Sequence, residues 1–165
     1  EAIALRPDRP EAYFNLGAVL DNSGHDVEAA QRYLEAKKRY TVGSKGWARA
    51  TAAAFIALMQ EVCAEVAKPE WWNDEGLKTL SARVVRAAPN DEKAISVRAL
   101  VLSGLNLKVG ASKPEPRSAA ELKEAAAYFD RSSVLFDASV LKLDAAQQAG
   151  WCRRKAAVMM LMGLS

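Results

Sequence analysis

Residues 13–36 read YFNLGAVLDNSGHDVEAAQRYLEA, and the spacing of their large and small apolar side chains predicts two packed helices. Apolar residues recur three or four positions apart until an Asn-Ser-Gly-His sequence breaks the pattern. Ala29, Tyr33 and Ala36 then continue the same spacing on the second helix. Gly17 and the alanines are small enough to let the two helices approach closely, so we expect a helical hairpin with large side chains filling the remaining space.

This spacing resembles the tetratricopeptide repeat, whose pattern is W-x₂-L-G-x₂-Y followed by A-x₃-F. Ser44 lies one repeat length, about 34 residues, after Pro10, and Trp47 then occupies the slot of Tyr13. The matching residues of the first complete repeat are Tyr13, Leu16, Gly17, Leu20, Gly24, Ala29, Tyr33 and Ala36. The resemblance implies an all-α fold, a tetratricopeptide-like array of about seven antiparallel helices in a right-handed superhelix.

Start and stop signals divide the rest of the chain into further helices. Candidate N-caps are Asp8, Ser44, Asn73 or Asp74, and Ser118 in a capping box with Glu121. The expected helices lie at about 10–22, 26–42, 45–66, 74–88, 92–107, 118–136 and 138–162, with no strand. The expected single domain consists of the tail of a preceding repeat (1–9), repeats at 10–43, 44–91 (extended) and 92–136, and a C-terminal helix (137–165). The loop at 108–117, with Gly110, Pro114 and Pro116, is expected to be the most mobile internal segment.

The bulk composition, 50% hydrophobic and 26% charged with a net charge of +3, is that of an ordinary globular protein. Basic residues are not clustered with aromatic ones as nucleic-acid binding requires, so no nucleic-acid partner is expected. The longest apolar run, Ala52–Met59, is too short to span a membrane. Two distant cysteines, Cys63 and Cys152, favour a reducing compartment, and we expect a cytoplasmic protein. Because the sequence begins inside a predicted repeat, a targeting segment before Glu1 is not excluded.

The sequence offers no convincing catalytic or metal-binding pattern. His25 is the only histidine and sits in a predicted turn, where we expect it to be exposed. Zinc needs about four closely spaced ligands, which one histidine and two distant cysteines do not supply. Glu61 and Glu65 are one helical turn apart, but solubility explains them more simply than acid–base catalysis. We therefore expect no catalytic residue, no metal and no cofactor, and the chain is not expected to be an enzyme.

Members of the tetratricopeptide family usually bind peptides in a concave groove lined by the first helix of each repeat. In the register of Tyr13 and Trp47, the residues expected to face this groove are Glu11, Phe14, Asn15, Ala18, Asn22, Lys45, Ala48, Arg49 and Ala52. The resemblance also places Asn15, Lys45 and Arg49 in slots where one subgroup carries a carboxylate clamp for the acidic C-terminal tails of cytosolic chaperones. The clamp's other two residues, a Lys and an Asn, would come from a repeat preceding Glu1.

Lys45 and Arg49 are one helical turn apart, so both should project from the same groove-facing stripe. Arg49 could then hold a peptide carboxylate by two hydrogen bonds, with Lys45 as a point charge, Asn15 as a neutral donor and Phe14 packing on the peptide. The competing interpretation is two solvated cations near a helix N-terminus, where the helix dipole disfavours them.

Two other sites are candidates for contact with a partner. Trp71 and Trp72 are adjacent in a predicted turn and cannot both point inward, so one is expected to be partly exposed and available to a partner. The competing interpretation is that they pack across the extended third helix. The C-terminal helix has no clearly polar face around Met159 and Met160, so it is expected to fold back into the array, to continue into further sequence or to meet another subunit. Self-association through this helix is one consequence.

The favoured hypothesis is a non-catalytic protein–protein interaction scaffold, an adaptor that binds a peptide or partner subunit in the concave groove. An acidic C-terminal tail is one candidate ligand. The alternative is a structural or accessory subunit, or a domain of a larger complex or enzyme, held by flat helical faces.

Overall fold

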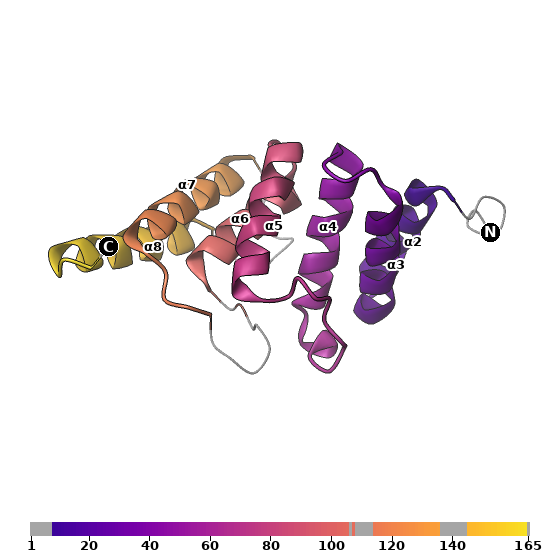
Figure 1. Cartoon of the computed structure of the whole chain (residues 1–165), viewed down its shortest axis with the longest axis horizontal. Coiled ribbons are helices and arrows are strands. Elements are labelled where there is room, and N and C mark those ends of the chain that lie inside the picture. The colour runs from indigo at the N-terminus through magenta and orange to yellow at the C-terminus, as the bar shows by residue number, and fades with distance from the viewer. Residues whose placement is uncertain (1–7, 106, 108–113, 136–144, 165) are drawn as a thin grey trace. The chain divides into compact units, whose positions relative to one another are not determined.

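The computed structural model describes residues 8–105, 107, 114–135 and 145–164. Within these residues the chain forms seven α-helices and one short 3₁₀ helix, and no strand. The expected all-α fold is therefore confirmed, whereas the tetratricopeptide-specific arrangement and the superhelix stay predictions. In chain order the helices are α2 (Pro10–Asn22), α3 (Asp26–Arg39), α4 (Lys45–Leu58), η1 (Glu61–Cys63), α5 (Asp74–Ala87), α6 (Glu92–Ser103), α7 (Ala119–Leu135) and α8 (Ala145–Leu161) (Figure 1).

The chain divides into two compact units that are interleaved in the sequence. Unit 1 comprises residues 1–70 and 83–94, and unit 2 comprises residues 71–82 and 95–165. Helices α5 and α6 therefore each contribute one part to unit 1 and another part to unit 2.

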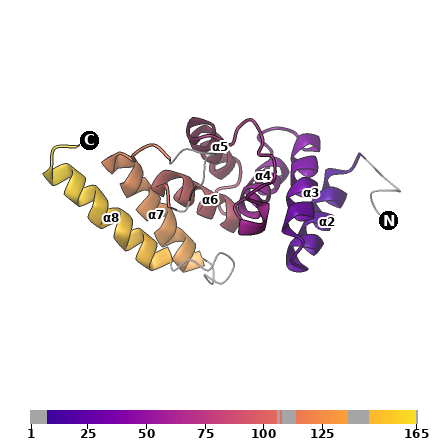
Figure 2. The ribbon, with the colours of Figure 1, turned by 90° about the horizontal axis from the view of Figure 1, so that it is seen from below.

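In unit 1, α2, α3 and α4 pack in sequence order, each against the next (Figures 1 and 2). The hairpin of α2 and α3 closes as expected, because a Cβ built on Gly17 would lie only 2.8 Å from Cδ1 of Tyr33. The bare glycine lets the ring of Tyr33, which is 1% exposed, lie directly against the backbone of α2. Helix α4 is buried on nearly all sides between Trp47 and Leu58, as its continuous apolar sequence predicts.

In unit 2, α7 and α8 lie side by side and pack against each other (Figure 2). A buried guanidinium holds the segment before α7 in place: Arg117 donates hydrogen bonds of 2.8 and 2.6 Å to the two carboxylate oxygens of Asp74 and one of 3.1 Å to the carbonyl of Val101. Another cation, Arg98 on α6, bonds to the Lys78 carbonyl at 2.9 Å and to Glu124 on α7 at 3.1 Å.

Most of the predicted caps are confirmed. Ser44 Oγ accepts the Trp47 N–H at 3.1 Å, and Asn73 rather than Asp74 caps α5 by accepting the Gly76 N–H at 2.8 Å. The capping box is also confirmed: the Ser118 N–H donates to the Glu121 carboxylate, and the Glu121 N–H donates to the Ser118 hydroxyl. The predicted cap at Asp8 is wrong, because the N-cap residue of α2 is Arg9, whose side chain makes no capping hydrogen bond. Pro10 occupies the first helical position, and because proline has no backbone N–H, this position leaves no donor to be capped.

Several predicted helix ends are wrong. The third helix ends at Leu58 instead of residue 66, and η1 follows after Gln60, which is extended. The fifth helix ends at Ser103 instead of residue 107, because Gly104 adopts a left-handed φ of 68°. Helix α3 ends at Arg39, before the expected Gly43 signal. Residues 108–113 of the predicted mobile loop and 138–144 of the predicted last helix lie outside the described residues.

Candidate functional site

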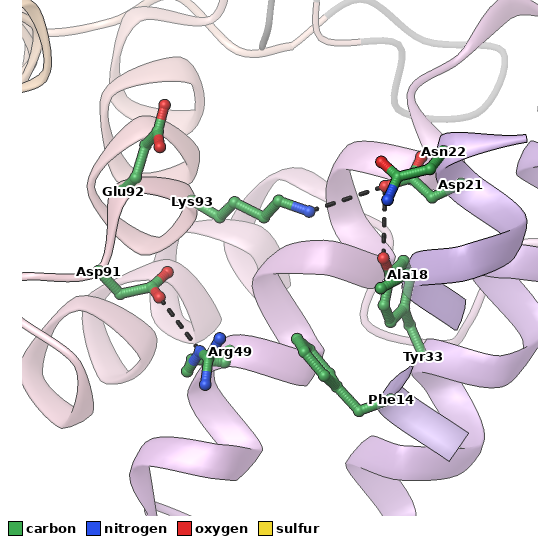
Figure 3. Close-up of a pocket in the computed structure, with 9 residues that line it drawn as sticks. All are labelled: Phe14, Ala18, Asp21, Asn22, Tyr33, Arg49, Asp91, Glu92 and Lys93. Atoms are coloured by element: carbon green, nitrogen blue, oxygen red, sulfur yellow. Dashed lines mark hydrogen bonds and ion pairs between the residues drawn. The ribbon is translucent and has the colours of Figure 1, made fainter. Parts of the chain in front are cut away.

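The candidate site is a pocket of about 340 Å³ in unit 1 (Figure 3). Three of its walls come from α2, α4 and the first turn of α6, and one residue of α3 completes it. The residues that line it are Phe14, Ala18, Asp21, Asn22, Tyr33, Arg49, Asp91, Glu92 and Lys93. This volume is at the small end of ligand pockets, which are roughly 300–1,000 Å³, so it suits one long side chain rather than a large cofactor.

Local sequence places these side chains. Phe14, Ala18 and Asp21 are three or four positions apart on α2 and so share one stripe of that helix. The third wall is fixed by a cap: Asp91 Oδ1 accepts the Ala94 N–H at 3.0 Å at the start of α6, which leaves Oδ2 facing the pocket. Lys93 in the same first turn then extends across to α2 (Figure 3).

Two aromatic rings form the floor of the pocket. The ring centroids of Phe14 and Tyr33 are 5.4 Å apart at 53°, a tilted arrangement favoured by aromatic pairs. The Tyr33 hydroxyl donates a hydrogen bond of 3.3 Å to Asp21 Oδ2. Burial, reinforced by the nearby Asp21 carboxylate, raises the pKa of Tyr33, so the hydroxyl stays a neutral donor at physiological pH.

Two ion pairs join α6 to the other walls. Arg49 Nε lies 3.4 Å from Asp91 Oδ2, and Lys93 Nζ lies 3.7 Å from Asp21 Oδ2. The same cations face the rings, with the Arg49 guanidinium 5.1 Å from the Phe14 centroid and the Lys93 ammonium 5.6 Å from that of Tyr33. The Arg49 side chain is 50% exposed, and pairs of this kind contribute about 0–1 kcal/mol, so a ligand can displace them.

Glu92 is the remaining charged group of the pocket. Among the described residues its carboxylate makes no hydrogen bond and no ion pair, and it points away from the two ion pairs (Figure 3). Partial burial raises the pKa of Glu92, Lys93 lowers it and Asp91 raises it further, with a net upward shift. The half-buried carboxylate therefore lacks the compensating partner that the other four charges of the pocket possess.

The structure brings only some of the predicted groove residues together. Phe14 and Arg49 line the pocket along with Ala18 and Asn22. Asn15 and Lys45 are exposed on α2 and α4 but do not line it, and Glu11 is likewise exposed outside it. Ala48 and Ala52 are fully buried and so cannot face a ligand, because α4 is packed on more sides than a single-groove helix would be. The carboxylate clamp stays a prediction, and its ligand would have to compete with Asp91 for Arg49.

The other predicted contact residues lie in unit 2. Trp72 is buried and Trp71 is half-buried, with ring centroids 5.7 Å apart, which agrees with the expectation that the two could not both point inward. Near the end of α8, Met159 is half-buried and Met160 is exposed. Their exposed apolar neighbours are Val158, Leu161, Met162 and Leu164.

Other chemistry is sparse in the described part of the chain. His25 is exposed in the turn before α3, and no cluster of three or more metal-ligating side chains occurs in the described ranges. Both cysteine thiols are buried and free; burial raises the pKa of Cys63 and raises that of Cys152 to about 11, so neither is an activated nucleophile. Within residues 8–105, 107, 114–135 and 145–164, no helix combines the length and apolar character needed to cross a bilayer.

Sequence reasoning missed the third wall of the pocket. The sequence patterns predict only a repeat boundary and a helix start at Asp91, Glu92 and Lys93, and a packed residue of the helical hairpin at Tyr33. One signal in the sequence indicates Asp91, Glu92 and Lys93. Helix α6 is the first helix of its predicted repeat, just as α2 and α4, which supply Phe14 and Arg49, are the first helices of theirs. Applying the same groove register to the third predicted repeat places the first turn of α6 beside Phe14 and Arg49.

Comparison with known proteins adds no constraint, because no protein-family model, curated protein or solved structure matches the chain.

Proposed function

We propose that this chain is a non-catalytic protein–protein interaction module of the tetratricopeptide type, which binds an extended peptide of a partner in the pocket of unit 1. One observation carries the proposal: the walls of the pocket come from α2, α4 and the start of α6, the first helices of three successive predicted repeats. A peptide groove lined by alternate helices is what the repeat resemblance implies.

The chemistry of the pocket supports a peptide ligand. Phe14 and Tyr33 offer apolar faces, while Asn22 and the charged side chains offer hydrogen-bond partners at the rim. The ion pairs that cross the pocket are weak enough to open, so binding does not require the helices to unpack. The acidic C-terminal tail suggested by the clamp slots is one ligand within this proposal.

The test is selection of peptides from a random twelve-residue display library, followed by calorimetry on the synthetic peptides. Ala18→Leu should fill the pocket and weaken binding at least tenfold, because a half-buried alanine lines it. Val19→Leu is the matched control: the neighbouring residue is 61% exposed and does not line the pocket. Thermal unfolding of both variants checks that they remain folded. Selected peptides that bind both variants equally would contradict the proposal.

A second proposal is a structural or accessory subunit held by flat helical faces. The observation that favours it is the exposed apolar end of α8, where Leu161 is 87% and Met162 is 68% exposed. A surface of this kind on a folded chain commonly marks a contact with another protein.

A further inference from the structure

The charges of the pocket favour one class of ligand over another. Its lining contains three carboxylates, Asp21, Asp91 and Glu92, but only two cations, Arg49 and Lys93. Each cation is already paired with one carboxylate, which leaves the pocket with an excess of one negative charge, on Glu92.

The aromatic walls add to the same preference. The rings of Phe14 and Tyr33 each already face a cation of the chain itself, at 5.1 and 5.6 Å. The face of an aromatic ring carries partial negative charge, so it attracts a cation and repels a carboxylate. The rings therefore stabilise positive charge in this pocket, and a ligand cation would share their faces with Arg49 and Lys93.

An acidic ligand meets the opposite situation. A carboxylate entering the pocket would have to displace Asp91 from Arg49 or Asp21 from Lys93, and it would leave that displaced carboxylate beside it. Like charges this close destabilise one another, and the unpaired Glu92 would add to the repulsion.

We infer that the pocket accepts a basic side chain, an arginine or a lysine of the partner peptide, whose charged group pairs with Glu92 while its aliphatic stem lies in the pocket. This inference rests on the peptide-binding function proposed above and names the chemistry of its ligand. The elongated, partly apolar side chain of arginine or lysine matches the small volume of the pocket and its combination of aromatic floor and acidic rim.

The test uses three blocked amino acids as probes: the N-acetyl methylamides of arginine, norleucine and glutamate. Each is titrated into the full chain, labelled with ¹⁵N, and the backbone amides of Phe14, Asp91 and Glu92 are followed by NMR. The arginine probe should shift these amides saturably and bind about three- to tenfold more tightly than norleucine, as expected for one partly desolvated charged contact. The glutamate probe should not shift them.

Two charge variants give opposite expected signs. Glu92→Gln should weaken the arginine probe about three- to tenfold, whereas Lys93→Met should strengthen it, because Asp21 loses its internal cation. An anion-binding pocket would show the reverse of both effects. Glu65→Gln and Lys123→Met are the matched controls: each makes the same charge change at an exposed residue outside the pocket and should leave binding unchanged.

The outcomes separate this inference from the proposed function. Tighter binding of the glutamate probe, equal binding of all three, or no binding of any would overturn the basic-ligand inference. The proposed function is decided separately by the library peptides and the Ala18→Leu variant, so an acidic or apolar selected peptide would leave it standing while removing this inference.

Discussion

Gly17 shows how the absence of one carbon atom positions a wall of the pocket. The Tyr33 ring lies 2.8 Å from the position that a Cβ of residue 17 would take, and its hydroxyl bonds to Asp21 one turn further along α2. Helix packing and pocket floor are thus set by the same contact. A larger residue at position 17 has to move the ring and, with it, the floor of the pocket.

Gly17→Ala is expected to destabilise the protein by about 1–3 kcal/mol, since two ring atoms of Tyr33 lie 2.8 Å from the added Cβ. Gly150→Ala is the control, because its Cβ would meet only the flexible end of Arg154 at 3.2 Å. That substitution should stabilise helix α8 by up to about 1 kcal/mol. Urea unfolding of both variants measures the difference, and an unchanged midpoint for Gly17→Ala would contradict the close-packing explanation.

The places of Phe14 and Arg49 in the pocket could be predicted, since helical spacing and the repeat register place them on one side of α2 and α4. The partner of Arg49 could not. Asp91 follows it by 42 positions, and only tertiary packing decides that its cap geometry turns one carboxylate oxygen towards Arg49. Helical spacing also predicts too much: Lys45 shares a stripe of α4 with Arg49, but it does not line the pocket.

At the scale of the elements, helix starts were predicted better than helix ends. A start such as that at Ser44 is fixed by a local side-chain bond that a sequence reveals. The end of α4, in contrast, depends on tertiary packing. Cys63 is buried and η1 packs against α3, while the Lys68 ammonium donates to the carbonyls of Cys63 and Val66. These contacts satisfy carbonyls that a continued helix would have used, and no spacing rule reveals them.

Ser44→Ala is expected to cost about 1 kcal/mol, because the Trp47 N–H loses its cap at the start of a buried helix. Ser23→Ala is the matched control: Ser23 is exposed, and its hydroxyl bonds only to the Val19 carbonyl at the end of α2. Its removal should change the free energy of unfolding by less than about 0.5 kcal/mol. Equal effects of the two substitutions would show that the cap does not stabilise α4.

Acid sensitivity is expected from the contact between α5 and the segment before α7. The hydrogen bonds from Arg117 hold the pKa of Asp74 below its usual range. A carboxylate with a lowered pKa stabilises the fold above its unfolded pKa of about 3.9, and this contribution is lost as pH falls through the lower folded pKa. The free energy of unfolding should therefore decrease below about pH 4.

Asp74→Asn tests this dependence. It should cost about 3–5 kcal/mol near neutral pH, because the Arg117 side chain is 2% exposed and keeps its charge, and it should flatten the loss of stability below about pH 4. Glu75→Gln removes an exposed carboxylate from the same turn and should do neither. Denaturation curves at a series of pH values decide; an unchanged pH slope in Asp74→Asn would contradict the assignment.

At the scale of the whole molecule, association through α8 is the expected consequence of its apolar end. Ala149, Cys152 and Ala156 are buried, but beyond them Met160 and Leu161 are exposed. A double substitution of Met160 and Leu161 to Gln should weaken self-association, measured by sedimentation velocity over a concentration series. Val19→Gln, which replaces a single exposed apolar residue on α2, should have no effect. A wild-type chain that sediments as a monomer at every concentration would contradict this prediction.

The interleaving of the two units has a consequence for synthesis on the ribosome. Translation delivers residues 1–70 first, but unit 1 is completed only by residues 83–94, after the first segment of unit 2 has already emerged. At roughly 5–20 residues per second, α2, α3 and α4 wait on the order of seconds for Asp91, Glu92 and Lys93. During that interval Arg49 and Asp21 have no α6 partner, and their charges can attract any oppositely charged segment nearby. A nascent chain halted before residue 91 therefore carries two walls of the pocket and lacks the third.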